Sequence, residues 1–330
     1  MKSLVVVCLA LFSVTASAAD MFARNKELGR GVNLGNALEA PNEGEWGMKI
    51  EDEFFPLIKQ AGFKHVRLPV KWTAHAAKES PFTVDAAFFA RVDHLLKQAE
   101  ANGLQVVLNH HHYSELDAKP KEELPRAVAI WKQVAARYKD RGDGLVFELM
   151  NEPHEKLNDD GAWTAAIPPL LAAVRETNPT RPIIIGPPYW NGIWALPKFK
   201  LPNDPNLIVT VHYYNPFEFT HQGAHWVEKS DKWLGKKWIG SEAEVAAVRK
   251  EFDSAVKWAE EHKRPLYLGE FGAFRKADSE SRAKWTTTIA REAEKRGWSW
   301  AYWEFGAEFS VYDREKKEWR PELRDALIPR

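Results

Sequence analysis

The chain has 330 residues with 46 basic and 46 acidic side chains, so its formal net charge is zero. This balance gives no electrostatic basis for binding nucleic acid or an anionic membrane surface. A chain of this length forms one large domain or two smaller ones, and its 15 tryptophans supply flat apolar surfaces for a core or for a ligand.

The first residues have the form of a secretory signal peptide. A basic residue precedes an apolar run at 4–14, and small residues follow at 16–19. The run is too short to span a bilayer well. We therefore expect a signal peptide over residues 1–19, one domain over residues 20–330, and a secreted protein, either extracellular or periplasmic. Because the single cysteine, Cys8, lies in the signal, we expect no disulfide and no thiol chemistry in the mature chain.

The remainder of the chain alternates apolar, strand-like runs with amphipathic helical segments. Several of the helical segments stop at a glycine or at an Asn-Pro pair, which are common helix ends. The expected strands are 31–36, 63–70, 104–109, 145–150, 182–186, 207–213, 265–270 and 298–303. The expected helices are 48–61, 85–102, 122–140, 162–177, 242–262, 279–295 and 321–328.

Eight strands that alternate with helices in about 300 residues predict an α/β fold, a single (β/α)8 TIM barrel. An open doubly wound sheet is the alternative, but no glycine-rich phosphate loop follows the first strand. No linker rich in Ser, Gly or Pro and no low-complexity segment divides the chain. We therefore expect no appended binding module.

Two of the strand-like runs end in a glutamate. One run is followed by Asn151 and Glu152, and another ends in Glu270 and a glycine. In a TIM barrel the C-terminal strand ends form the active site, so these two carboxylates can face each other across the barrel mouth. A pair of carboxyl groups is what glycoside hydrolysis requires. Each glutamate alone also fits an ordinary solvent-facing strand end, and it is the pair that favours catalysis.

The other predicted strand ends carry mainly polar and aromatic side chains. They are Asn36, Arg67, His111, His112, Asn151, Trp190, His212, Tyr214 and Trp303. An indole can cover the apolar face of a sugar ring, and an arginine near a carboxylate holds that group ionised. Structural explanations exist as well: an ion pair for the arginine, a loop cap for the tyrosine and a core position for Trp303. Glu148, in mid-strand, fits a buried structural ion pair better than catalysis.

The histidines at 110–112 raise a different possibility, a zinc site, because some zinc hydrolases are TIM barrels. Such a site needs further ligands at other strand ends. His212 is available, but the first strand has no His or Asp at the corresponding place. The arginine and the paired glutamates would then lack roles, so we expect no metal and no cofactor.

The chain resembles glycoside hydrolase family 5, a large family of retaining β-glycanases, in six motifs that follow the family's order. The motifs are VRLP, HHY, LMNEP, HYY, LGEFG and YWEF. Together they cover essentially the whole mature chain. The resemblance is closer still to the Thermotoga-type endoglucanase/mannanase branch, in the stretches GRGVNLGNALEAPNEG, HYYNPFEFTHQGA and KWLGKKW.

The resemblance implies a role for each matching residue. Glu152 would be the acid/base and Glu270 the nucleophile, with Arg67 and Tyr214 holding and tuning the nucleophile. Asn151 would bind the 2-hydroxyl of the reacting sugar. The further contacts that the resemblance implies are Asn36, Glu39, His111, His112, Trp190, Trp226, Trp303 and, beside the acid/base, His212.

The implied activity is that of a metal-independent, retaining endo-β-1,4-glycanase acting on cellulose, mixed-linkage glucan and glucomannan, and also on mannan. The alternatives are a dedicated endo-β-1,4-mannanase, a non-catalytic carbohydrate-binding barrel and a metal-dependent TIM-barrel hydrolase. The two glutamates argue against the non-catalytic barrel. The expected partner is therefore a β-glucan or mannan polysaccharide, without nucleic acid, membrane or an appended carbohydrate-binding module.

Overall fold

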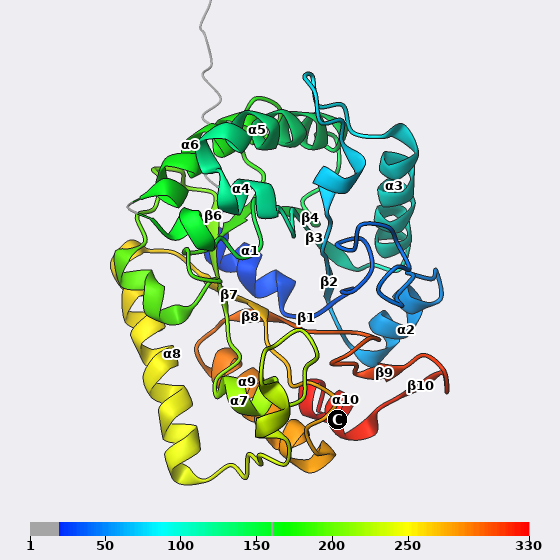
Figure 1. The fold of residues 1–330 in the computed structure, drawn as a ribbon, viewed down its shortest axis with the longest axis vertical. Helices are drawn as coiled ribbons and strands as arrows, with labels where there is room; N and C mark the ends of the chain where they lie inside the picture. The colour runs from blue at the N-terminus through cyan, green and yellow to red at the C-terminus, as the bar shows by residue number, and fades with distance from the viewer. Residues whose placement is uncertain (1–19, 160, 330) are drawn as a thin grey trace, which may run out of the picture.

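The structure, a computed structural model, describes residues 20–159 and 161–329. Eight parallel strands close into a barrel in chain order, and helices surround them (Figure 1). The strands are β1 (Arg30–Asn33), β2 (His65–Leu68), β3 (Gln105–Asn109), β4 (Leu145–Glu148), β5 (Ile183–Ile185), β6 (Leu207–His212), β7 (Leu266–Glu270) and β8 (Ser299–Tyr302). The predicted single TIM barrel is confirmed.

Each predicted helix has a counterpart in the structure, and two of them, α8 and α9, have the predicted bounds. The helices are α1 (Met21–Leu28), α2 (Phe54–Ala61), α3 (Ala86–Ala101), α4 (Ser114–Ala118), α5 (Pro120–Arg137), α6 (Ala162–Arg175), α7 (Phe217–Thr220), α8 (Glu242–His262), α9 (Ser279–Lys295) and α10 (Pro321–Leu327). A small antiparallel pair, β9 (Tyr312–Asp313) and β10 (Glu318–Trp319), follows the barrel.

One predicted helix is partly wrong. The segment expected to be helical over 48–61 becomes helical only at α2. Before it, Met48 and Ile50 are buried while Lys49 and Glu51 are exposed, an alternation of period two that belongs to extended chain. The apolar residues at 48 and 50 therefore reach the core from an extended segment.

The expected signal peptide lies outside the described residues. The first described element is α1, which begins after Asp20, whose carboxylate accepts hydrogen bonds from the backbone N–H groups of Phe22 and Ala23. Such a side-chain cap satisfies N–H groups that the helix itself leaves unpaired. Within the described part of the chain, no helix combines the length and the apolar character needed to cross a membrane.

The lower part of the barrel interior, toward the N-terminal strand ends, is mainly apolar, although buried His65 and Ser299 form hydrogen bonds there. Side chains of a strand alternate between its two faces, so every second residue points into the barrel. The interior cluster consists of Met21, Leu28, Val107, Val146, Ile184, Ile208, Tyr267 and Ala301. Two of these residues come from α1, so this helix closes the N-terminal end of the barrel.

The next interior layer, toward the C-terminal strand ends, is polar. Asn109 and Glu148 lie two residues beyond the interior valines of their strands and are paired in register, as are Asn33 and Arg67. All four side chains are fully buried. Buried polar groups require partners, so this layer must form its own hydrogen-bond network.

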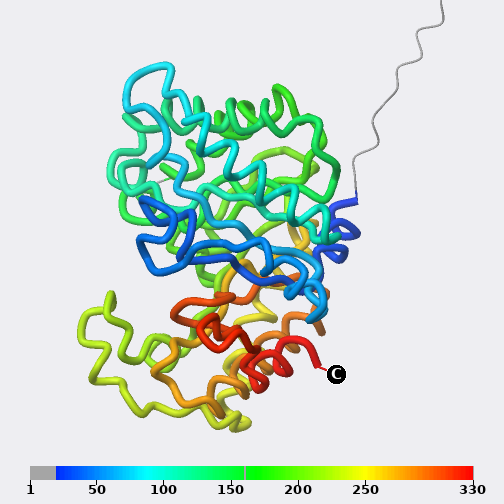
Figure 2. The backbone as a smooth tube through the Cα atoms, turned by 90° about the vertical axis from the view of Figure 1, so that its right-hand side faces the viewer, coloured from blue at the N-terminus to red at the C-terminus, as the bar shows by residue number. Residues whose placement is uncertain are grey.

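At the C-terminal end of the barrel, the longest loop lies between a strand and the long helix that follows it. Between β6 and α8 the chain makes an excursion over residues 213–241 that contains α7 and extends away from the barrel body (yellow-green in Figure 2). The sequence pattern predicted no element here. This excursion supplies one wall of the cleft described next.

Candidate active site

The C-terminal strand ends surround a cleft of about 460 Å³. Both predicted catalytic carboxylates, Glu152 and Glu270, line it. The full lining is Asn36, Glu39, Trp46, His111, His112, Asn151, Glu152, Tyr214, His221, His225, Trp226, Glu270, Trp303, Glu308 and Phe309. The cleft therefore lies where TIM barrels carry their active sites.

Arg67 organises the polar layer beneath this cleft. Its Nε and Nη2 atoms donate to the two oxygens of Glu148 at 2.7 and 2.8 Å. Its remaining N–H groups donate to Asn33 Oδ1 at 2.8 Å, Glu270 Oε1 at 2.8 Å and Asn151 Oδ1 at 2.5 Å. All five donors of the guanidinium thus have acceptors, so its planar fork fixes four neighbouring side chains. The structural ion pair expected for Glu148 is present.

Glu270 is held at both of its oxygens. Arg67 donates to Oε1, and the hydroxyl of Tyr214 donates to Oε2 at 3.0 Å. The hydroxyl stays protonated because burial, followed by the charge of Glu270, raises the pKa of Tyr214 well above its usual value. The expected contacts of Arg67 and Tyr214 with Glu270 are therefore present.

The pKa of Glu270 departs from the simplest expectation. Burial raises it above the ordinary value, while His212 and Arg67 lower it and the charge of Glu152 raises it. The expectation that the arginine alone would keep this pKa low is thus incomplete, because it omitted desolvation. The charged form still has two fixed donors to stabilise it.

Glu152 has a different environment. Its side chain is 23% exposed, and its Oε1 lies 2.6 Å from Nδ1 of His212. Burial raises its pKa to about 7, against lowering contributions from Arg67 and His154. Burial also lowers the pKa of His212 to about 4, so this imidazole is neutral near pH 7. The amide of Asn191 faces Nε2 at 3.4 Å, which assigns the ring proton to Nδ1 and a donor role toward Glu152.

The two carboxyl groups are close. Ligand atoms of Glu152, His212 and Glu270 all lie within 4.8 Å of one another. Two carboxyl groups this close cannot both ionise freely, so the pair shares a proton. That proton resides on Glu152, because Glu270 has the cation and the hydroxyl as fixed donors. The arrangement thus places a protonated carboxyl group opposite an ionised one at short range, rather than leaving room for a water between them.

Comparison with known proteins agrees with this chemistry. Residues 26–309 match the model of the family described as cellulase, glycosyl hydrolase family 5. The chain belongs to this family. The glycosyl hydrolase family 5 relatives include Endoglucanase H of Acetivibrio thermocellus, which is 36% identical over 322 residues that cover 96% of this chain and 34% of the relative. The chain thus spans about a third of that relative's length.

Some solved structures are similar to this chain along nearly their whole length. Cel5A of Thermotoga maritima, solved in complex with cellobiose and with mannotriose, is 52% identical with a TM-score of 0.92; the match covers 94% of this chain and 100% of Cel5A. The cellulose synthase subunit Z of Clostridioides difficile is 36% identical with a TM-score of 0.88; the match covers 91% of this chain and 99% of that subunit.

Most of the predicted family 5 site residues meet at the cleft, but three do not line it. Arg67 lies fully buried beneath the carboxylates, and His212 lies behind Glu152 with 5% exposure. Trp190 lies outside the cleft, half exposed. The predicted residues that line it are Asn36, Glu39, His111, His112, Asn151, Glu152, Tyr214, Trp226, Glu270 and Trp303.

Trp303 and His111 form one wall of the cleft beside Glu270. Their rings stack at a centroid distance of 5.5 Å and an angle of 14°. Burial lowers the pKa of His111 well below its usual value, so the ring is neutral. Its Nδ1 faces the amide of Asn109 at 3.1 Å, which assigns the proton to Nε2, on the side of Glu270. The wall is therefore an uncharged, aromatic surface.

Glu39 adds a third carboxyl group to the cleft. It is buried and accepts the backbone N–H groups of Asn36 and, at 3.0 Å, of Ala37. Burial raises its pKa to about 8, so it is largely protonated near pH 7. A protonated carboxyl at this place can both donate to and accept from a hydroxyl group of a ligand.

Five residues that line the cleft were not among the predicted site residues. They are Trp46, His221, His225, Glu308 and Phe309. They come from loops after β1, β6 and β8, where no periodicity marks a side chain as facing the site. The abundance of tryptophan and histidine in these loops was the one available signal.

Only one cluster of acids and histidines in the described part of the chain has metal-binding spacing, and it is formed by Glu152, His212 and Glu270. None of the histidines at 110–112 belongs to it, and His110 instead stacks on Tyr113 at 5.0 Å. The three ligands also fit a cation poorly, because a guanidinium already neutralises Glu270 at 2.8 Å. The zinc site considered from the histidine run therefore lacks its ligand set.

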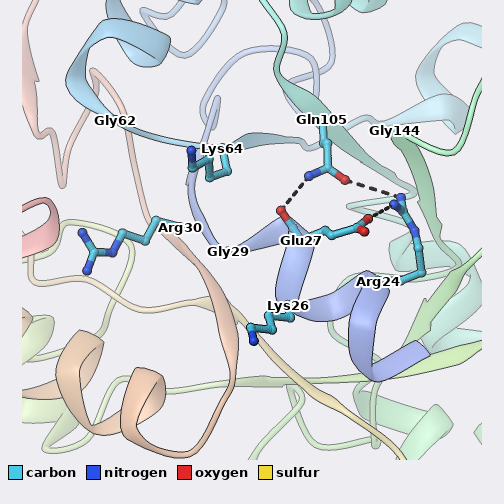
Figure 3. A pocket seen from close by; sticks show the side chains of 9 residues that line it. All are labelled: Arg24, Lys26, Glu27, Gly29, Arg30, Gly62, Lys64, Gln105 and Gly144. Carbon is cyan, nitrogen blue, oxygen red and sulfur yellow. Dashed lines mark hydrogen bonds and ion pairs between the residues drawn. The ribbon is translucent and has the colours of Figure 1, made fainter. Parts of the chain in front are cut away.

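A larger hollow of about 780 Å³ lies at the opposite end of the barrel (Figure 3). Its lining is basic, from Arg24, Lys26, Arg30 and Lys64, with Glu27 as the only acid. Glu27 is paired with Arg24, as the dashed line in Figure 3 shows. Without two converging carboxyl groups this hollow cannot perform glycoside hydrolysis.

Proposed function

We propose that this chain is an endo-β-1,4-glucanase that cleaves internal bonds of β-glucans with retention of anomeric configuration. The observation that carries the proposal is the close pair formed by Glu152 and Glu270, of which Glu270 alone is held by a guanidinium and a tyrosine hydroxyl. The names of the family 5 relatives, which are endoglucanases, support the substrate class.

In the first step Glu152 donates its proton to the glycosidic oxygen while Glu270 attacks the anomeric carbon. The bond to the leaving sugar breaks, and a glycosyl ester forms on Glu270. His212 keeps its N–H on one oxygen of Glu152, so the acidic O–H of the other oxygen faces the cleft. In the second step the ionised Glu152 removes a proton from water. This water attacks the anomeric carbon from the face that the leaving sugar occupied, and the ester bond to Glu270 breaks.

Asn151 is oriented for the sugar next to Glu270. Its Oδ1 accepts from Arg67, so its amide N–H₂ group remains available to the cleft that it lines. We assign this donor to the 2-hydroxyl of the reacting sugar, a contact that strengthens in the transition state of glycosidases. Trp303 supplies an apolar wall for the same ring.

We also propose that mannan-type chains are substrates. Gluco- and manno-configured chains differ at C2, and a site that rejects one of them must leave a polar group unpaired. Cel5A of Thermotoga maritima has been solved with both cellobiose and mannotriose. We expect rates on glucomannan and barley glucan within about tenfold, a barrier difference below about 1.4 kcal/mol.

Three measurements test the proposal: a substrate panel, the stereochemistry of the first product and activity after chelation. A panel of carboxymethylcellulose, barley glucan, xyloglucan, glucomannan, mannan and xylan measures substrate class, and an exclusive preference for mannan would establish the dedicated mannanase instead. Proton NMR of the first product measures stereochemistry. The β-anomer should appear first, and an initial α-anomer would reject retention. Activity on none of the polymers would favour a non-catalytic barrel, and activity lost on chelation would favour a metal-dependent hydrolase.

We further propose that the protein is secreted, on the basis of the signal-like residues 1–19. N-terminal sequencing of the mature protein from its native host measures this directly. A start near residue 19 or 20 would support secretion, and an intact Met1 would contradict it.

A further inference from the structure

Asn191, in the loop after β5, is a buried polar residue beside the histidine that contacts the acid/base. Its φ of 56° lies in the left-handed region, which asparagine, aspartate and glycine tolerate better than other residues do. A Cβ at Gly186 would lie 2.2 Å from Oδ1 of Asn191, so the amide occupies space that exists only because residue 186 has no side chain. The backbone and the packing therefore fix where this amide lies.

The orientation of the amide follows from one of its contacts. Its nitrogen donates to the backbone oxygen of Asn151. A carbonyl oxygen can only accept, so the amide atom that faces it must be the nitrogen and not the oxygen. The same nitrogen faces Nε2 of His212 at 3.4 Å. Oδ1 of Asn191 has no hydrogen-bond partner among the described residues, so this side chain acts through its N–H groups alone.

These contacts determine which ring nitrogen of His212 carries the proton. Because an amide N–H group faces Nε2, this nitrogen is the acceptor, and the proton is on Nδ1. Burial lowers the pKa of His212 to about 4, so the ring is neutral near pH 7 and has only one N–H group. On the Nδ1 side, Glu152 Oε1 lies at 2.6 Å and Glu270 Oε2 at 3.7 Å. The single N–H group of the ring therefore points to the carboxyl pair.

The histidine is held at its backbone as well as at its ring. His212 N–H donates to Asn191 O at 3.0 Å, so the asparagine contacts the histidine through both its main chain and its side chain. A Cβ at Gly269 would lie 2.9 Å from Nε2 of His212, so the lack of a side chain there makes room for the ring. A closed path of contacts thus leads from Asn151 O through Asn191 and His212 to Glu152, the next residue after Asn151.

We propose that Asn191 is a positioning residue for the acid/base, because its amide holds His212 in the tautomer that donates to Glu152. This inference rests on the proposed glycanase function. With Nδ1 as a donor, one oxygen of Glu152 accepts from the ring, and the acidic proton stays on the other oxygen, toward the cleft. With Nδ1 as an acceptor, the O–H group of Glu152 would donate to the ring instead. The glycosidic oxygen would then lose its proton donor.

NMR of protein labelled with ¹⁵N-histidine tests the tautomer directly. Two-bond couplings from the ring hydrogens show which nitrogen is protonated, and the signals of His212 are those absent from His212→Gln. In the wild type, Nδ1 should carry the proton near pH 7. In Asn191→Asp a carboxylate acceptor replaces the amide donor, so the proton should move to Nε2. Aspartate has nearly the same shape and tolerates the same φ, so the fold should be kept. An Asp variant in which Nδ1 is still protonated would overturn the proposal.

Kinetics test the consequence for the acid/base. For Asn191→Asp, kcat/KM on barley glucan should fall about 10- to 100-fold. On an aryl β-cellobioside with a good leaving group, which needs little proton assistance, kcat/KM should stay within about twofold. Asn191→Gly keeps the φ and also loses the bond to Asn151 O, but it places no acceptor at Nε2, so its loss on barley glucan should be less than about tenfold. Equal losses on barley glucan in the two variants would show that the bond to Asn151 matters and the tautomer does not.

Asn178→Asp is the matched control. Asn178 is also a buried amide that donates to a backbone oxygen, Ala135 O at 2.8 Å, but it lies before β5 at the other end of the barrel. The substitution should leave the ratio of the two kcat/KM values and the His212 signals unchanged. A wild type that is inactive on both substrates would refute the glycanase function itself. An active wild type with the proton on Nε2 of His212 would refute the role of Asn191 alone.

Discussion

The two interior layers of the barrel are built on opposite principles. The lower layer consists mainly of apolar residues such as Val146 and Ile184 and is closed by α1. The upper layer, two residues along the same strands, holds Arg67 and Glu148 in a network without solvent exposure. The same backbone geometry thus supports a mainly apolar, uncharged layer at one end and a buried ion cluster at the other.

The comparison of the two layers shows which part of the interior is built for stability and which part is built to position the site. Burial of apolar area favours folding, whereas a buried ion pair often stabilises no more than well-packed hydrophobic residues of the same size. The upper layer is therefore explained by the position that it gives to Glu270 and Asn151, not by folding. Variants in the upper layer should mainly change rates, and variants in the lower layer should mainly change stability.

The largest effect on activity is expected at the nucleophile. Glu270→Gln removes the carboxylate that attacks the anomeric carbon, so kcat should fall on the order of 10⁴-fold or more on every substrate. Glu294→Gln, which changes a carboxylate paired with Arg30 at the other end of the barrel, is the control and should leave kcat unchanged. Substantial turnover by Glu270→Gln would show that another group attacks.

The acid/base variant should be selective between substrates. Glu152→Ala removes the proton donor, so hydrolysis of barley glucan should fall by about 10²–10⁴-fold. An aryl glycoside with a good leaving group needs little proton assistance, so its glycosyl-enzyme should form and accumulate as a burst. Azide should then release a β-glycosyl azide, detectable by NMR. The same burst in Glu270→Ala would mean that the two roles are exchanged.

The guanidinium fork can be separated from its charge. Arg67→Lys keeps a cation but supplies three donors where five acceptor contacts exist, so Asn151 or Glu270 loses its fixed orientation. We expect kcat to fall about 10²-fold with little change in KM for an aryl cellobioside. If Arg67→Lys and the wild type had equal kcat and equal melting temperature, the positive charge alone would be sufficient for catalysis.

The sequence predicted the barrel because local signals repeat. Apolar runs of strand length mark each βα unit, and helix-stop signals mark several of the helix ends. Gly297 follows α9, while α8 begins at the cap Ser241 and is followed two residues after its C-cap by Pro265. The helix α1 was missed, although Asp20 at its start and buried residues at Met21, Asn25 and Leu28 follow helical spacing. These signals lay directly behind the signal-like segment, in the part of the chain for which no element was predicted.

Site residues on strands were predicted better than those on loops. A strand fixes the direction of its side chains, so Glu270 at the end of β7 had to face the barrel mouth. Loops such as the excursion after β6 have no such rule, which is why His221 and His225 were missed. The rise in the pKa of Glu270 was not predicted either. It results from burial, and the degree of burial is a property of the whole fold.

The pH dependence should report the two carboxyl environments. The acid must be protonated, and the pKa of Glu152 is raised to about 7, so kcat/KM should decline as the pH rises above about 7, approaching tenfold per unit. The nucleophile must be ionised, so the acidic limb follows the raised pKa of Glu270. In Glu152→Ala, the pH profile of the glycosylation rate on an aryl glycoside should no longer decline at alkaline pH, while its decline at acidic pH should remain. If the alkaline decline is unchanged, a group other than Glu152 causes it.

The smallest effect on activity is expected in the lower layer. Ile184→Ala deletes buried methyl and methylene groups from the apolar interior, at a side chain with no exposed surface. Such deletions leave a cavity and lower the free energy of unfolding by about 2–4 kcal/mol. Because Arg67 and its partners lie in the layer above and keep their contacts, kcat per folded molecule should stay within about twofold of wild type.

Chemical denaturation measures the free energy of unfolding. Active-site titration with a mechanism-based inhibitor gives the concentration of folded enzyme by which kcat is normalised. A large loss of kcat at full folding would show that the polar layer depends on packing beneath it, and the two layers would then act as one unit.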